Sequence, residues 1–340
     1  MKILVTGGAG FIGTHTCVEL LLNGFKVVVI DNLTNSKFQA IERVEKITGK
    51  SILFNHFDLL DTQKLNQVFL EHEFDAVLHF AGLKSIAESV RMPTDYYHNN
   101  VFGTLNLCKT MASHNVKKLI FSSSATVYGN PTKLPIVESS PLSPLNPYGR
   151  TKMYIEQMLE DIYTADTEWM VAILRYFNPV GAHNSALIGE DPGNTPNNLM
   201  PVICQTAIRK NAKLVIFGND YPTKDGTGIR DYIHIDDLVR GHLATLDAFF
   251  DSNLNIPGIN HFNLGTGKGI SVLELIKTFE SCNGVTIEYE FAAKRPGDIV
   301  ASFANAERIE NFLGWKTRKD IKDMCKDSWN WQLKNPTGYR

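Results

Sequence analysis

The stretch Ile3-Leu4-Val5-Thr6-Gly7-Gly8-Ala9-Gly10-Phe11-Ile12-Gly13 decides the fold of this chain. A short apolar run leads into a glycine-rich turn, and a helical pattern follows the turn. Gly8, Gly10 and Gly13 fit the pattern G-x-G-x-x-G. Glycines at these places allow a tight turn and let a pyrophosphate approach the backbone at the amino end of the next helix. A position between a strand and a helix is the context that this pattern requires.

The next apolar run, Val27–Ile30, ends at Asp31. This acid lies roughly 20 residues beyond the turn, where a carboxylate accepts the hydroxyl groups of an adenine ribose. A 2′-phosphate would be repelled there, so the sequence predicts NAD rather than NADP. The alternative is a plain tight turn with a capping aspartate, but the glycines and the acid occur together at the spacing of a dinucleotide site.

Short apolar runs alternate with helical patterns through the first half of the chain. Runs that are apolar on both faces indicate a parallel sheet covered by helices on both sides. The order predicts an α/β fold with a doubly wound parallel (Rossmann) sheet. Strands are expected at 3–5, 27–30, 52–54, 76–78, 119–121 and 170–175, and helices at 11–23, 61–72 and 95–115.

A different pattern starts near Asn178. From there to Pro201 the chain is rich in glycine, proline and asparagine, which is typical of a long loop. We expect an NAD-binding domain at residues 1–177 and a smaller C-terminal mixed α/β substrate lobe at 178–340, with a soft boundary and some exchange of chain between them. Helices of this half are expected near 236–250, 271–282 and 318–333.

Composition narrows the classes of protein. The 340 residues are 43% hydrophobic and 21% charged with a net charge of −2, which is ordinary for a globular protein and argues against nucleic-acid binding. The five cysteines are scattered and the histidines lack ligand spacing, so we expect free thiols, no metal, and structural roles for His79 and His234. The first strand begins too early for a signal peptide, and no apolar run is long enough for a bilayer. We therefore expect a cytoplasmic protein without membrane contact.

Tyr148 and Lys152 form the second informative pattern. Asn146-Pro147 is a typical helix start, so both side chains fall on one helix face, one turn apart. Ser124 ends an expected strand, at the sheet edge where ligands bind. A tyrosine becomes a base near neutral pH if its pKa falls by about 3 from its usual value of about 10, and an ammonium group and a positive nicotinamide ring both lower it. We expect removal of a proton and a hydride from a carbon that bears a hydroxyl group.

An alternative interpretation makes this spacing accidental. Lys152 would then form a surface ion pair with Glu156, worth only a few tenths of a kcal/mol. The strand-end serine and the dinucleotide loop favour the catalytic interpretation.

Longer segments carry a resemblance to a known family. They are Phe80-Ala81-Gly82-Leu83-Lys84, Ser122-Ser123-Ser124-Ala125-Thr126-Val127-Tyr128-Gly129, Arg175-Tyr176-Phe177-Asn178-Pro179-Val180-Gly181-Ala182, Pro196-Asn197-Asn198-Leu199-Met200-Pro201, Ile216-Phe217-Gly218-Asn219-Asp220-Tyr221-Pro222-Thr223 and Gly228-Ile229-Arg230-Asp231-Tyr232-Ile233-His234. With these segments the chain resembles, nearly end to end, the extended short-chain dehydrogenases/reductases and, among them, the UDP-glucose 4-epimerases.

The resemblance implies interconversion of UDP-galactose and UDP-glucose through a 4-keto sugar, with NAD bound throughout. It implies that Tyr148 takes the proton of the 4-hydroxyl, Ser124 hydrogen-bonds near that oxygen, and Lys152 holds the nicotinamide ribose and lowers the pKa of the tyrosine. Hydride leaves C4 and returns to the opposite face once the ketone has turned in the pocket. The implied cofactor contacts are Gly7, Gly10, Phe11, Ile12, Gly13, Asp31, Asn32, Asn35, Ser36, Asp58, Leu59, Phe80, Ala81, Gly82, Lys84, Asn99, Ser122, Tyr148, Lys152 and Phe177.

The resemblance also implies a nucleotide-sugar site in the second lobe. Arg230 and Arg295 suit a diphosphate because they are cations with forked donors. The implied substrate contacts are Lys84, Ser124, Asn178, Asn198, Leu199, Phe217 against the uracil, Arg230, Arg295, Asp298 on a ribose, and Ser302. Family members usually form homodimers through two long helices, here near 95–115 and 147–164.

Ser302 bears on substrate breadth. In this family a tyrosine at this position restricts the enzyme to plain hexoses, whereas a small residue leaves room at C2. The resemblance therefore implies that UDP-N-acetylglucosamine and UDP-N-acetylgalactosamine are interconverted as well. The alternative is that Ser302 merely faces solvent.

Two rival functions share the fold. A 4,6-dehydratase needs an acid and a base, which relatives supply as an Asp-Glu pair where this chain has Ala125 and Thr126. A non-catalytic NAD-sensing protein is compatible with the fold alone, but it would not need Ser124, Tyr148 and Lys152.

Overall fold

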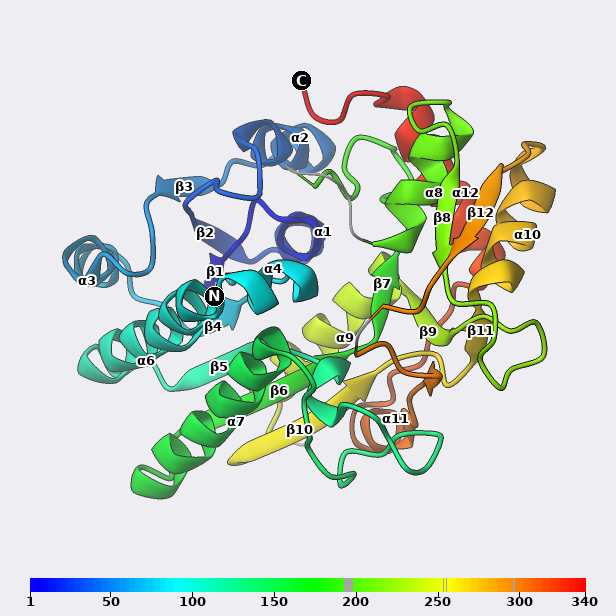
Figure 1. Ribbon diagram of the computed structural model, residues 1–340. Helices are drawn as coiled ribbons and strands as arrows, with labels where there is room; N and C mark the ends of the chain where they lie inside the picture. The colour runs from blue at the N-terminus through cyan, green and yellow to red at the C-terminus, as the bar shows by residue number, and fades with distance from the viewer. Residues whose placement is uncertain (193–197, 253, 255, 296) are drawn as a thin grey trace.

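The computed structural model describes residues 1–192, 198–252, 254, 256–295 and 297–340 (Figure 1). A seven-stranded parallel sheet has the order β10-β6-β5-β4-β1-β2-β3. Its strands are β1 (Lys2–Thr6), β2 (Lys26–Asp31), β3 (Leu53–His56), β4 (Ala76–His79), β5 (Lys118–Ser124), β6 (Met170–Tyr176) and β10 (Ile259–Leu264). The predicted doubly wound α/β fold is confirmed.

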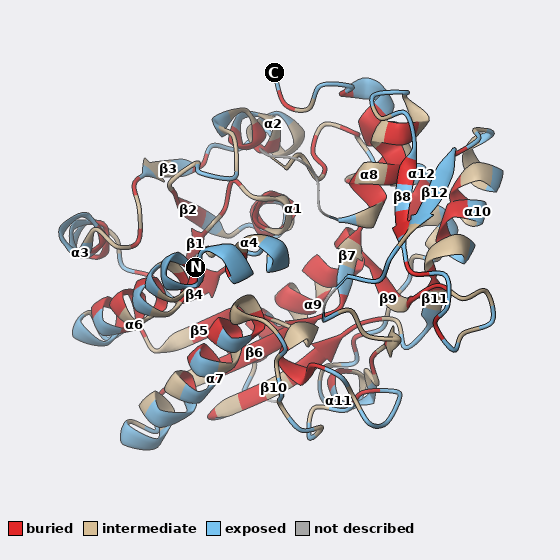
Figure 2. Cartoon of the chain, in the orientation of Figure 1, coloured by how far each residue is buried: buried red, intermediate tan, exposed pale blue. Residues whose placement is uncertain are grey.

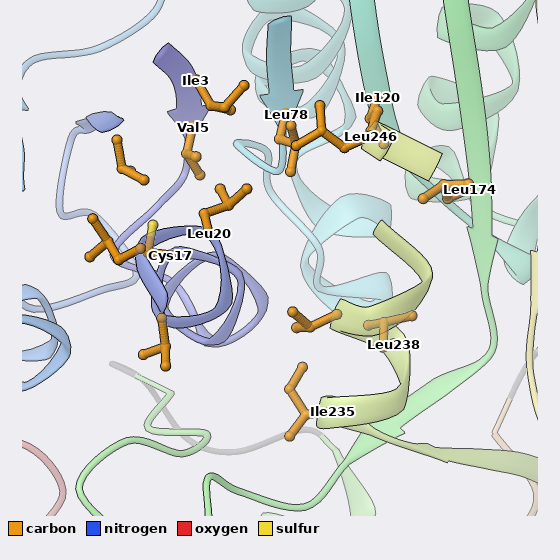
Figure 3. Close-up of a cluster of buried hydrophobic side chains, with 14 of the residues drawn as sticks. Ile3, Val5, Cys17, Leu20, Leu78, Ile120, Leu174, Ile235, Leu238 and Leu246 are labelled. Atoms are coloured by element: carbon orange, nitrogen blue, oxygen red, sulfur yellow. The ribbon is translucent and has the colours of Figure 1, made fainter. Parts of the chain in front are cut away.

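Helices cover both faces of this sheet, as Figure 2 shows by the buried strands between half-exposed helices. One face is covered by α1 (Phe11–Leu22), α2 (Phe38–Thr48) and α9 (Ile235–Ala248), and the other by α3 (Thr62–Glu71), α6 (Gly103–Ser113) and α7 (Pro147–Ala165). Successive residues of a strand point to opposite faces. Ile3 and Val5 accordingly pack under α1 and α9 (Figure 3), whereas Leu4 packs in the cluster on the other face.

The second lobe contains two small sheets. The first joins β7 (Asn178–Val180), β9 (Ile229–His234), β11 (Gly269–Ser271) and β13 (Ala301–Ser302), and the second joins β8 (Leu214–Phe217) and β12 (Tyr289–Ala292). Buried apolar residues of α8 (Leu199–Ala207), α10 (Val272–Asn283) and α12 (Ile321–Lys334) form its core. The short helices elsewhere are α4 (Ile86–Arg91), α5 (Pro93–Tyr96), η2 (Ala125–Tyr128) and α11 (Glu307–Leu313).

Two expectations about elements need correction. The single helix expected at 95–115 consists of α5, a π-helical segment η1 (Tyr97–Phe102) and α6, and the buried Asn100 of η1 exchanges hydrogen bonds with the backbone of Leu83. The long loop expected at 178–201 begins with β7 and ends in α8, because β7 finds a partner in β9, more than 50 residues away. Pro196 and Asn197 lie outside the described residues.

The chain returns to the first lobe after entering the second. β10 pairs with β6 at the sheet edge, and α9 packs against α1. Among the described residues, no helix combines the length and the apolar character needed to cross a membrane.

Candidate active site

The glycine turn joins β1 to α1 and leaves the amino end of the helix open. Gly7 has φ +70°, and a Cβ on Gly13 would lie 2.3 Å from the carbonyl oxygen of Gly7, so both positions require glycine. A Cβ on Gly10 would meet only that same oxygen, at 3.3 Å. Gly10 is also the N-cap of α1, where the described structure shows no side-chain cap and no acidic residue in the first turn. The loop is thus an anion site that a dinucleotide pyrophosphate fits.

Asp31 fastens this turn to the next one. Its carboxylate accepts hydrogen bonds from the backbone N–H of Ala9 (3.0 Å), the backbone N–H of Leu33 (2.9 Å) and the hydroxyl of Ser36 (2.8 Å). A carboxylate has about four lone-pair sites, so acceptor capacity remains for a ribose hydroxyl. The sequence offered a ribose contact and a capping aspartate as alternatives, and the structure shows that this carboxylate does cap the turn.

The other predicted cofactor residues surround the carboxyl edge of the sheet. Asn32 donates to Asp58 at 2.7 Å, and the backbone N–H groups of Phe80 and Ala81 donate to the carbonyl of Thr6. A Cβ on Gly82 would lie 3.8 Å from Nζ of Lys152, so the loop after β4 passes close to α7, which carries Lys152. Phe11, Ile12, Leu59 and Asn99 are at least partly buried, Phe177 is buried, and Asn35 is exposed.

The structure brings Ser124, Tyr148 and Lys152 together. α7 begins as predicted, with the Asn146 side chain accepting from the N–H of Gly149 at 2.9 Å. Lys152 is 5% exposed, and its Nζ donates to the carbonyl of Ser122 at 2.8 Å and lies 6.0 Å from the centroid of the Tyr148 ring. Ser124 ends β5 and hydrogen-bonds with Tyr148. The serine at the strand end and the Tyr148–Lys152 pair, which the sequence predicted separately, thus lie together at one edge of the sheet.

The ionisation of the pair differs from the expectation. Burial raises the pKa of Tyr148, and the hydrogen bond from Ser124 opposes this effect. Burial lowers the pKa of Lys152 to about 8, and the nearby Glu156 carboxylate opposes this effect. In the protein without its cofactor, burial thus outweighs the contribution of Ser124, and the pKa of the phenol lies above its usual value. A cationic ring beside the phenol would act in the same direction as Ser124.

The alternative surface pair of Lys152 with Glu156 is wrong. Glu156 is buried and accepts hydrogen bonds from Arg175, at 2.6 Å from Nη2 and 3.1 Å from Nε, and from the hydroxyl of Ser123. Because Arg175 engages Glu156, the ammonium of Lys152 stays available to the active site.

Several predicted substrate residues fall into two groups, one between the lobes and one in the second lobe. Lys84 and Asn198 both donate to Oε1 of Glu190, at 3.1 and 2.6 Å, so this carboxylate joins the two lobes. The guanidinium of Arg295 lies 4.9 Å from the centroid of the exposed Phe217 ring and forms a bidentate pair with Asp298. Asp298 is therefore engaged by Arg295, which the sequence did not indicate.

Four further predicted residues lie at or near the four-stranded small sheet. Arg230 donates from Nη1 to the carbonyls of Ile229 and Ile299, and its neighbour in register on β13 is Ser302. Ser302 is 7% exposed, so the alternative in which it faces solvent is wrong. Asn178 begins β7 and is exposed, and Leu199 is the first residue of α8.

Sequence reasoning missed Glu190, whose contacts with Lys84 and Asn198 depend on the tertiary fold. The histidines are structural as expected: His79 contacts the hydroxyls of Thr6 and Thr104, and His234 contacts Asp327. The described residues contain no cluster of three or more histidine, cysteine or acidic side chains suited to a metal ion.

Comparisons with known proteins agree with this geometry. The model of a family described as GDP-mannose 4,6 dehydratase matches residues 4–328. The UDP-glucose 4-epimerase of Bacillus subtilis (strain 168) is 55% identical over 340 residues, which cover 100% of this chain and 99% of that protein.

Solved structures of similar proteins share the fold. The UDP-glucose 4-epimerase of Bifidobacterium longum in complex with NAD+ and UDP has a TM-score of 0.96 at 50% identity and covers 100% of both chains. The UDP-Glc/GlcNAc 4-epimerase of Campylobacter jejuni has a TM-score of 0.84 at 39% identity, over 98% of this chain and 99% of that one.

Proposed function

Because the chain belongs to the UDP-glucose 4-epimerases of the extended short-chain dehydrogenase/reductase family, we propose that it interconverts UDP-galactose and UDP-glucose through a 4-keto sugar, with NAD as its cofactor. The observation that carries the proposal is the juxtaposition of Ser124, Tyr148 and buried Lys152 at the sheet edge beside the glycine turn. No net oxidation is required, because the same hydrogen leaves C4 and returns.

The residues of the chain divide the work. NAD, when bound, supplies the acceptor that takes the hydride from C4 and later gives it back. Tyr148 removes the proton of the 4-hydroxyl and returns it, and Ser124 stabilises the phenolate by donating a hydrogen bond. Lys152 supplies positive charge from a fixed position, since Ser122 holds its ammonium. Gly7, Gly10, Gly13 and Asp31 would hold the pyrophosphate and the adenine ribose of the cofactor.

The substrate is anchored at a distance from the reacting carbon. Arg230 and Arg295 are placed to bind the diphosphate, and Phe217 offers an exposed ring to the uracil. Asn178, Asn198 and Leu199 complete the nucleotide side of this proposal. Binding by the nucleotide leaves the hexose free to turn over between the two hydride transfers.

Incubation of the purified protein with UDP-galactose, without added NAD, tests the proposal. Formation of UDP-glucose is expected, and the cofactor released on denaturation should be NAD. Lack of conversion by protein that does contain NAD would overturn the proposal. A 4,6-dehydratase would instead release water and form a 4-keto-6-deoxy sugar, but its acid–base pair is replaced by Ala125 and Thr126.

Substrate breadth is the second part of the proposal. Ser302 is buried beside Arg230, where a small side chain leaves room for an N-acetyl group at C2. The chain then also interconverts UDP-N-acetylglucosamine and UDP-N-acetylgalactosamine. Steady-state assays of wild type and Ser302→Tyr with both substrate pairs decide this. We expect Ser302→Tyr to lose turnover of the N-acetylated pair and to keep turnover of UDP-galactose and UDP-glucose. A wild-type protein that is inactive on the N-acetylated pair would contradict this second part of the proposal.

We further propose a homodimer built on the helices near 95–115 and 147–164. Phe102 of η1 and Tyr154 of α7 are 46% and 44% exposed, on elements that contact each other. Large exposed apolar side chains on neighbouring helices support an interface. Sedimentation equilibrium of wild type and of Phe102→Glu/Tyr154→Glu should give a dimer and a monomer, and a monomeric wild type would reject the interface.

The proposed location is the cytoplasm. All five cysteines are free thiols and four of them are buried, as suits a reducing compartment. Fractionation of the source cells with an antibody to the protein should find it in the cytosolic fraction, and recovery with secreted proteins would contradict this.

A further inference from the structure

We propose that Thr126 is a positioning residue for the reaction: its hydroxyl, together with its backbone N–H, fills the acceptor sites of the Ser124 hydroxyl and thereby commits the proton of Ser124 to Tyr148. This inference rests on the proposed epimerase activity and names a residue that acts through Ser124 without touching the substrate.

The geometry places Thr126 directly on Ser124. β5 ends at Ser124, whose backbone is extended (φ −149°, ψ 144°) and caps the short helix η2. The serine Oγ accepts the backbone N–H of Thr126 at 3.2 Å and the Thr126 hydroxyl at 2.9 Å. Thr126 is half-buried, and among the described residues its hydroxyl makes no other hydrogen bond.

A count of donors and acceptors favours one direction for the hydrogen bonds of the Ser124 hydroxyl. A serine hydroxyl has one proton and two lone pairs. Thr126 occupies both lone pairs, so Ser124 can enter any further hydrogen bond only as a donor. The Thr126 backbone N–H cannot reverse its direction. The Thr126 hydroxyl has no other acceptor among the described residues, so donation to Ser124 is the arrangement that satisfies its proton.

The remaining partner of the serine is the phenol of Tyr148, with which it hydrogen-bonds. A donor directed at the phenol oxygen favours the ionised form, which is the form that accepts the proton of the sugar. If the threonine hydroxyl were absent, Ser124 would regain a lone pair and could accept the phenolic proton instead. That arrangement would favour the protonated tyrosine and slow the chemical step.

Removal of the hydroxyl with little change of shape tests this role. Thr126→Val should lower kcat for UDP-galactose about fivefold, as expected for the loss of one neutral hydrogen bond, and leave KM within about twofold. Thr126→Ser, which keeps the hydroxyl, should restore kcat. Thr126→Ala serves in the same way if the valine variant does not fold. Thr278→Val is the matched control, since that exposed hydroxyl only bonds to its own helix backbone.

A double-mutant cycle with Ser124→Ala shows whether Thr126 acts through the serine. We expect Ser124→Ala/Thr126→Val to equal Ser124→Ala within about twofold in kcat, because nothing remains to be oriented. A further fivefold loss in that background, a wild-type kcat for Thr126→Val, or no restoration by Thr126→Ser would each overturn the proposal. Failure of the proposed function is distinguishable, since the wild-type protein would then be inactive as well.

Discussion

At the scale of single residues, the site depends on Tyr148 in an environment that opposes its ionisation. Burial raises the pKa of the phenol, and the serine hydrogen bond is the protein's opposing contribution. Lys152 is also buried, and its pKa is lowered to about 8. The protein thus places a weak base next to a cation that is near its own titration point, which makes both sensitive to hydrogen bonding.

Replacement of Tyr148 by phenylalanine should separate chemistry from binding. The change removes only the phenolic oxygen, so NAD binding and folding should persist while kcat falls by about 10²-fold or more, as is usual for loss of a general base. Turnover and the NAD content of the purified variant measure the two effects. Tyr289→Phe on β12 is the control, because that side chain is 40% exposed and lies outside the proposed site and interface. A Tyr148→Phe variant with normal turnover would exclude the assigned base.

Spacing predicted the pairing of Tyr148 and Lys152, because residues four apart share a helix face. The sequence could not show whether Lys152 forms an ion pair with Glu156 or belongs to the active site. Arg175 decides between the two, because it forms the ion pair with Glu156 instead. Arg175 lies on β6, which follows α7 in the chain. The hydrogen bond from Ala9 to Asp31 likewise depends on the fold, because 22 residues separate the two.

At the scale of elements, two glycines of the junction between β1 and α1 have different roles, one in folding and one in cofactor binding. Gly13→Ala would drive a Cβ into the Gly7 carbonyl at 2.3 Å, whereas at Gly10 the nearest atom is 3.3 Å away. The chain therefore needs glycine at 13 for its own packing, and at 10 chiefly to keep space for a pyrophosphate.

We expect Gly10→Ala to fold with a near wild-type melting temperature and contain less NAD, and Gly13→Ala to lose both stability and NAD. Differential scanning calorimetry and the absorbance of released cofactor measure these effects. Gly103→Ala, in a helical conformation with its nearest neighbour at 3.9 Å, is the control that should change neither. Full NAD content in Gly10→Ala would argue against pyrophosphate at this turn.

The junction of α7 with β5 and β6 depends on one buried ion pair. Glu156→Leu leaves the Arg175 guanidinium, 4% exposed, without its carboxylate, and should lower the free energy of unfolding by about 3–5 kcal/mol. Urea unfolding of this variant, compared with Glu156→Leu/Arg175→Met, measures the cost of the unpaired charge, which the double variant should largely recover. Glu310→Gln, from an exposed pair with Lys316, should change the free energy by less than about 1 kcal/mol. A Glu156→Leu variant as stable as wild type would show that the pair does not hold the junction.

At the scale of the whole molecule, the two lobes are joined by more than the loops between them. β10 and α9 come from the second half of the sequence and complete the core of the first lobe (Figure 3). On the other side, Arg43 of α2 donates to Leu187 and Asn335 and lies 4.9 Å from the ring centroid of Tyr339 (Figure 1 shows α2 near the C-terminus). Periodicity predicted most helices of this half, but not these contacts, because pairing between distant segments leaves no local pattern.

The interior of the first lobe contains histidines whose pKa is lowered by burial, which makes stability depend on pH. Burial lowers the pKa of His79 from 6.5 to about 3. The folded form binds its proton less readily than the unfolded form, so the stabilising contribution is complete above pH 6.5 and is lost as the pH falls toward 3. Between pH 7.5 and 5.0 this one side chain should reduce the free energy of unfolding by about 2 kcal/mol. Urea unfolding of His79→Gln tests this. At pH 7.5 the variant should be less stable than wild type, because Thr6 and Thr104 lose well-placed hydrogen-bond partners. Between pH 7.5 and 5.0, however, its free energy of unfolding should fall by about 2 kcal/mol less than that of wild type. The exposed His98→Gln should retain the wild-type dependence, and an unchanged pH dependence in His79→Gln would show that His79 is not neutral in the folded protein.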